Sequence, residues 1–182
     1  MRILRPRFNI RENFYAFNLQ PPDAYALIKG GPLAPYIRGQ VFFYQLKDGV
    51  YIRAYITGIP EVTSSGSPST FHGFHIHEFG SCLVGNEKNP FTEAGGHWNP
   101  EKKPHPFHPG DLPPLLSTNG IAMMTVYTPN FLVNDVIGKS LIIHEGVDDF
   151  TTQPAGNSGP RLACGMINPS SNANTGPQPR YT

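Results

Sequence analysis

An alternating run between residues 49 and 58 constrains the fold more than any other stretch of this chain. Apolar side chains occupy every second position, at Val50, Ile52, Ala54 and Ile56. Because side chains of a strand alternate between its two faces, this period predicts a strand with one face on a core. The Asp48-Gly49 pair is typical of a hairpin turn, since glycine accepts a positive φ. Residues 39–47 and 49–58 are therefore expected to form a hairpin.

Six more strands are expected around this hairpin. They are 23–29, the histidine-rich segment around residue 75, 115–118, 121–128, 140–144 and 161–167. The chain has 19 glycines and 20 prolines, and only 15% of its residues are charged, which suits short strands joined by turns. We expect an all-β fold of about eight strands, a sandwich or flattened barrel, with two long loops at 81–114 and 145–160 and no assigned helix.

Three histidines and a cysteine lie close together between residues 71 and 82. In a strand, His75 and His77 share one face, whereas His72 lies on the other face with Phe74 and Ile76. Two neighbouring imidazoles on a rigid strand can hold one zinc or copper ion. For this pair alone, two surface or hydrogen-bonded histidines are an equal alternative. His72 is expected to be buried and hydrogen-bonded rather than a ligand.

The loop from 81 to 114 has recurring prolines and no periodic segment. A loop of this length usually has a function or an internal ligand that holds it. Four candidate ligands fall within it, at His97, His105, His108 and Asp111. Three imidazole nitrogens and one carboxylate are an ordinary tetrahedral zinc set. The spacing favours zinc over the alternative of a solvated loop rich in histidine and proline.

Four separated segments, taken together, resemble the copper/zinc superoxide dismutases of the bacterial type. They are Gly73-Phe-His-Ile-His-Glu-Phe-Gly, Gly96-His-Trp-Asn-Pro, His108-Pro-Gly-Asp-Leu, and Ile143-His-Glu with Gly156-Asn-Ser-Gly-Pro-Arg-Leu-Ala-Cys-Gly. The resemblance covers residues 25–167. It implies an eight-stranded antiparallel Greek-key sandwich or flattened barrel, and an oxidoreductase that converts superoxide into oxygen and hydrogen peroxide.

The resemblance also implies the residues that hold the metals. The copper ligands would be His75, His77, His97 and His144, and the zinc ligands would be His97, His105, His108 and Asp111. His97 belongs to both sets, so its imidazole must lose its N–H proton to bind two metals. Only Pro106 and Phe107 separate His105 from His108, which is a shorter interval than in the family pattern.

Further roles follow from the same resemblance. Asp148 matches the carboxylate that links histidines of the two metal sites, and His72 matches a structural histidine beneath the copper strand. Arg161 matches the arginine that positions superoxide beside copper, and His97 would carry a proton during the cycle. Cys82 and Cys164 match an intrachain disulfide, although two thiols are equally compatible with the cysteine count.

Composition bounds the remaining possibilities. The formal net charge is +1 with no basic run, so we expect no nucleic-acid partner. No apolar window reaches the length of a membrane span, and residues 1–10 do not form a signal peptide, so we expect no membrane partner and a cytoplasmic or undetermined location. The expected organisation is an N-terminal arm (1–22), one domain (23–167) and a disordered polar tail (168–182).

A superoxide dismutase containing copper and zinc, with superoxide as its substrate and a homodimer as an option, is thus the leading hypothesis. One alternative is a non-catalytic copper-binding or copper-delivery domain on the same fold, since fold alone does not fix function. Such a domain is expected to lack a copper ligand or the arginine. A zinc-stabilised structural domain is a second alternative, and it has no need of His75, His77 and His144.

Overall fold

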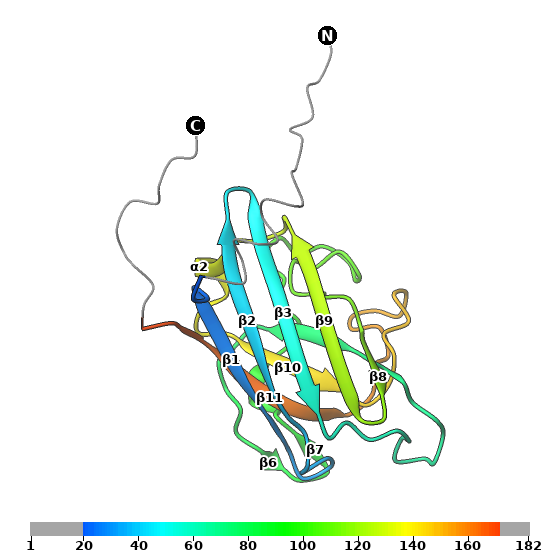
Figure 1. Cartoon of the computed structure of the whole chain (residues 1–182). Coiled ribbons are helices and arrows are strands. Elements are labelled where there is room, and N and C mark those ends of the chain that lie inside the picture. The colour runs from blue at the N-terminus through cyan, green and yellow to red at the C-terminus, as the bar shows by residue number, and fades with distance from the viewer. Residues whose placement is uncertain (1–19, 172–182) are drawn as a thin grey trace.

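In the computed structural model, which describes residues 20–171, one large antiparallel sheet curls into a nearly closed barrel (Figure 1). The sheet order is β4-β8-β9-β3-β2-β1-β11-β10-β5. The strands are β1 (Ala24–Gly30), β2 (Arg38–Leu46), β3 (Gly49–Thr57), β4 (Phe71–His72), β5 (Phe74–His77), β8 (Leu115–Thr118), β9 (Ile121–Thr128), β10 (Ser140–His144) and β11 (Arg161–Pro169). The expected all-β antiparallel fold is confirmed.

The barrel closes at Gly73. β4 pairs with β8 at one end of the sheet and β5 pairs with β10 at the other, yet only Gly73 separates β4 from β5 in the chain. Its peptide groups form hydrogen bonds at this junction: Gly73 N–H donates to Gly146 O (2.8 Å), and Gly73 O accepts from His144 N–H (2.8 Å). A Cβ at this position would lie 2.6 Å from Ser158 Oγ, so the close approach requires glycine.

The core fills the space between the two halves of the sheet, with β10 and β11 lying behind β1, β2, β3 and β9 in Figure 1. The alternation that predicted β3 is the observed one, since Val50, Ile52 and Ile56 are fully buried. On the opposite wall, Phe74 and Ile76 of β5 are also fully buried in the core. The period of two thus aims every second residue of β5 outward, away from the core.

The expected strands 115–118, 121–128 and 140–144 are found with these bounds. Those at 23–29, 39–47, 49–58 and 161–167 shift by one or two residues at one or both ends, and the histidine-rich segment forms two strands, β4 and β5. The long loop, expected to lack regular structure, contains the short strands β6 (Gly85–Asn86) and β7 (Asn89–Pro90) and a 3-10 turn, η1 (Thr92–Ala94). A single helical turn, α2 (Val133–Val136), was also not expected. Elements of two or three residues, and a single helical turn, are too short to show a period in the sequence.

The predicted domain limits at 22 and 167 stay predictions. Residues 1–19 and 172–182 lie outside the described part of the chain, and with them most of the predicted arm and tail. β11 continues to Pro169, and Ser170 N–H donates to Asp23 O (2.9 Å). Within residues 20–171, no helix has the length and apolar character needed to cross a membrane.

A disulfide joins Cys82 to Cys164, which settles the alternative left open by the cysteine count. Cys164 lies on β11 and Cys82 at the start of the long loop, and the two are 82 residues apart in the chain. The cross-link therefore fixes the beginning of the loop to the barrel wall.

We predict that reducing this disulfide lowers the free energy of unfolding by up to about 4.5 kcal/mol, the chain-entropy value for a closed loop of this length. Urea unfolding of the oxidised and reduced wild type measures the change, since the reduced protein keeps both sulfur atoms and loses only the cross-link. Cys82→Ala/Cys164→Ala should unfold at a similar urea concentration to the reduced wild type. A difference below about 1 kcal/mol would contradict a stabilising role.

Candidate metal centre

The outward face of the closing strand supplies the first two metal-binding side chains. Phe74 and Ile76 point into the core, so His75 and His77 point out of the barrel. β10 runs beside them, with Ile142 opposite His75 and Ser140 opposite His77. His144 follows on the same face, at a point where the pairing of β10 with β11 shifts register. Three imidazoles thereby gather on a rigid two-strand platform.

The long loop brings His97 to this platform through main-chain hydrogen bonds. His97 forms an isolated bridge with His77, and Asp111 forms one with His75. Trp98 N–H donates to Ile76 O (2.8 Å), and Ile76 N–H donates to Gly110 O (2.9 Å). The loop therefore occupies the edge of β5 that faces away from β10, where unpaired peptide groups would otherwise be exposed.

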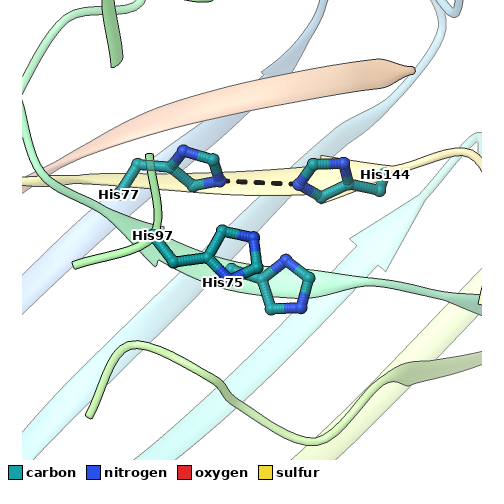
Figure 2. Close-up of side chains that lie close together, drawn as sticks. All are labelled: His75, His77, His97 and His144. Atoms are coloured by element: carbon teal, nitrogen blue, oxygen red, sulfur yellow. Dashed lines mark hydrogen bonds between the residues drawn. The ribbon is translucent and has the colours of Figure 1, made fainter. Parts of the chain in front are cut away.

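One nitrogen from each of four histidines lies within 4.8 Å of the other three (Figure 2). His77 Nδ1 donates to Gly95 O (3.0 Å) and His144 Nδ1 donates to Gly159 O (3.1 Å), so each Nε2 carries a lone pair. These two Nε2 atoms face each other at 3.5 Å. Two lone pairs at this distance need a cation between them, which is the condition a metal fulfils.

The third and fourth nitrogens of this set are buried and unsatisfied. His75 Nε2 donates to Asp148 Oδ2 (2.8 Å), which leaves Nδ1 as an acceptor. Among the residues described, His75 Nδ1 and His97 Nε2 have no hydrogen-bond partner. Buried polar atoms rarely lack a partner, and here both face the gap between His77 and His144. Four neutral imidazoles suit copper.

The second set surrounds the carboxylate of Asp111. Its oxygens lie 2.7 Å from His97 Nδ1, 3.0 Å from His105 Nδ1 and 3.2 Å from His108 Nδ1. His105 Nε2 donates to Asp148 Oδ1 (2.8 Å), so its Nδ1 and the Asp111 oxygen are two acceptors in contact. A cation between them fits, and three nitrogens with one oxygen suit zinc. The short interval between His105 and His108 does not prevent the four ligands from converging.

Burial keeps three of the copper-set imidazoles neutral, those of His75, His77 and His144. Desolvation lowers the pKa of His75 to about 4, in spite of its hydrogen bond to Asp148. It also lowers the pKa of His77 and His144 well below their usual value, assisted in each case by a neighbouring histidine and by Arg161. Neutral imidazole is the form that binds a metal, so His75, His77 and His144 are ready to act as ligands at neutral pH.

Asp148 connects the two sites from the second loop. Burial opposes its ionisation, but hydrogen bonds from His75, the Phe150 amide and His105 outweigh that effect and lower the pKa of Asp148. Its two oxygens hold one ligand of each metal, and each bond fixes which ring nitrogen faces the metal. A Cβ at Gly156 would lie 2.0 Å from Asp148 Oδ1, so a glycine there is what admits the carboxylate.

His72 and Arg161 lie at the margins of the copper set. His72 is buried on the inner side, where Nδ1 donates to His144 O (3.1 Å) and Nε2 lies 3.2 Å from Ser117 Oγ. The Arg161 guanidinium donates to Phe91 O and to Gly95 O (2.7 Å). Gly95 O also accepts from His77, so one carbonyl holds both a copper ligand and the arginine.

Several groups that orient the ligands were not predicted from the sequence. The carbonyls of Gly95 and Gly159 fix the rings of His77 and His144, and Gln153 holds the backbone of His105. A carbonyl acceptor has no side-chain signature in a sequence. Their Gly-rich surroundings were visible only as turn signals.

The fold and site define a β-barrel protein with a copper site and a zinc site that share one histidine. The pattern of the family described as copper/zinc superoxide dismutase (SODC) matches residues 37–167. This chain belongs to the copper/zinc superoxide dismutase family.

Relatives with known names agree with this assignment. A superoxide dismutase [Cu-Zn] from Pasteurella multocida is 42% identical over 110 residues, which cover 53% of this chain and 59% of that protein. One from Aquifex aeolicus is 33% identical over 145 residues, covering 71% and 79%. The structure of the Cu/Zn superoxide dismutase from Brucella abortus superposes with a TM-score of 0.64 at 28% identity, covering 79% of this chain and 98% of that one. The matched part of the chain spans about three fifths of the first relative's length.

We predict that His97→Ala disturbs both metals, whereas His75→Ala disturbs copper alone. Loss of a ligand should lower the affinity for the affected metal by more than about 100-fold, because losing even a group that hydrogen-bonds to a ligand lowers metal affinity about 10–100-fold. Elemental analysis and the electron paramagnetic resonance spectrum of copper(II) measure the outcome. A wild-type copper spectrum in His97→Ala would show that His97 is not a copper ligand and so is not shared by the two metals.

Proposed function

We propose that this chain is a superoxide dismutase that converts two superoxide anions and two protons into oxygen and hydrogen peroxide. The observation that carries the proposal is the pair of complete ligand sets that share His97. Copper supplies one-electron redox chemistry when bound there, and zinc, which has none, supplies a fixed charge that holds the shared imidazole. The family and the names of its relatives support the same activity.

In this proposal, His97 supplies a proton position. Its Nδ1 is held on the Asp111 side and its Nε2 faces the other three copper ligands. With Nδ1 held on the zinc side, Nε2 would be the position that takes up a proton and gives it to the peroxide product. His97 is 93% buried, and Asp111 fixes the orientation of its ring. The proton would therefore stay at a defined place.

Arg161 binds the anionic substrate in this proposal. The guanidinium is half-buried, and desolvation lowers its pKa without making it neutral at physiological pH. Two carbonyl contacts hold it in place, and its charge reaches His77 and His144. A fixed cation in a partly desolvated place attracts and orients a small anion beside the copper ligands.

The test of the proposal is superoxide consumption measured on a sample whose copper and zinc contents are known. Superoxide consumption well above the spontaneous rate in buffer, and proportional to copper content, supports enzymatic activity. A protein that binds copper at full occupancy and consumes no superoxide would instead favour the non-catalytic copper-binding alternative. A homodimer stays a prediction, which sedimentation velocity of the purified chain checks.

We predict that Arg161→Ala lowers the rate of turnover about tenfold with unchanged metal content, since about 1.4 kcal/mol of electrostatic stabilisation is lost. Arg161→Lys keeps the charge but loses the two-pronged contact with the carbonyls, so its rate should be intermediate. Arg38→Ala, at an exposed arginine of β2, is the matched control and should turn over like the wild type. Wild-type turnover in Arg161→Ala would make the arginine a structural residue only.

We predict a shallow salt dependence of the rate constant, a fall of less than about threefold between 10 and 150 mM salt. In the second loop, Glu145, Asp148 and Asp149 oppose Arg161, so the loop has little attraction for a distant anion. Lys102 and Lys103 are exposed, and Lys103 pairs with Glu101 at 2.7 Å. Pulse radiolysis measures the rate. A steep fall that disappears in Lys102→Gln/Lys103→Gln would place the steering charge in the long loop.

A further inference from the structure

The main chain of the zinc ligand His105 is held by a single side chain from the other loop. Gln153 Oε1 accepts from His105 N–H (2.9 Å), and Gln153 Nε2 donates to His105 O (2.7 Å). The amide thus pairs with both peptide groups of one residue, as a neighbouring strand would. Gln153 takes no part in the metal sets and matches none of the motifs in the sequence.

The other zinc ligands are positioned differently. His108 and Asp111 bond each other within one turn, through His108 N–H to Asp111 Oδ2 (3.1 Å) and Asp111 N–H to His108 O (3.0 Å). His97 is carried by its bridge to β5. Among the described hydrogen bonds, those that His105 makes through its main chain go to Gln153.

Proline explains why His105 needs this support. Pro104 and Pro106 flank it and have no N–H, so His105 has the one peptide donor in residues 104–106. The segment therefore has few ways to hold itself in place. His105 is nevertheless 97% buried, and its Nδ1 must face Asp111.

We propose that Gln153 is a positioning residue for zinc, which sets the place of His105 Nδ1 by fixing the backbone behind it. Asp148, five residues earlier on the same loop, fixes the ring through Nε2 (2.8 Å). The two contacts together define the ring's position and its rotation. The inference depends on the zinc site and not on the activity proposed above, and its readouts require no turnover.

The experiment compares Gln153→Ala and Gln153→Met with the wild type. Methionine keeps the length and most of the packing of glutamine and removes both hydrogen bonds. Zinc affinity of the copper-free protein is measured by competition with a chromophoric chelator, and cobalt(II) in the zinc site reports ligand geometry through its absorption spectrum. We expect both variants to bind zinc about tenfold more weakly, with an altered cobalt spectrum and copper affinity within about twofold of the wild type.

Asp149→Ala is the matched control. Asp149 lies on the same loop and accepts from Thr151 N–H (2.9 Å) and Thr152 N–H (2.7 Å), so its loss loosens the loop without removing a contact to His105. We expect this variant to bind zinc within about threefold of the wild type. An equal loss of zinc in Asp149→Ala would assign the effect to loop order and overturn the proposal. Wild-type zinc affinity in Gln153→Met would overturn it too, by showing that packing suffices.

Discussion

The strand that closes the barrel is the constraint on which both metal sites depend. β4 and β5 are one stretch of chain interrupted at Gly73, and they pair with opposite ends of the sheet. Their main chain therefore closes the barrel while their inward side chains fill the core. Phe74 and Ile76 do so on the inner face, which forces His75 and His77 outward. The remaining edge of β5 takes the long loop, whose bonds to Ile76 deliver His97 and Asp111. Core packing thus aligns the ligands before any metal is present.

The same burial makes the metal-free site sensitive to acid. An unfolded histidine has a pKa near 6.5, whereas His75 in the fold has a pKa of about 4. Between these values the unfolded chain binds the proton more readily, so the contribution of His75 to stability is lost as the pH falls from about 6.5 to about 4. Metals act in the opposite sense, since they bind only the folded arrangement and compete with protons for the same nitrogens.

Local patterns in the sequence were enough to find the longer strands, and turn dipeptides marked where two hairpins reverse. Asn119-Gly120 marks the hairpin between β8 and β9, and Asn119 has the positive φ (51°) that such a turn uses. The parity of His72 with Phe74 and Ile76 likewise indicated burial, and His72 is 1% exposed. The zinc set was suggested by the spacing of its residues within the long loop, whereas the complete copper set came from the order of the four motifs.

Contacts between distant residues were beyond such patterns. The sequence does not show that β4 and β5, which are neighbours in the chain, pair at opposite ends of the sheet. The need for glycine at position 73 comes from the nearby Ser158 side chain, which is distant in the sequence. Nor does the sequence show that Gln153 pairs with His105, 48 residues away, since the bond goes to main-chain atoms. The short interval between His105 and His108 likewise does not show that the second loop contacts His105 from outside that interval.

The long loop is also tied to β11 on the copper side. The disulfide attaches Cys82 to β11, and Arg161 at the start of the same strand holds the loop again at Phe91 O and Gly95 O. Gly95 O in turn fixes the ring of His77. The residue that would bind the substrate thus also holds the loop whose carbonyl orients one copper ligand. Substitution of Arg161 by lysine therefore separates charge from anchoring, which substitution by alanine does not.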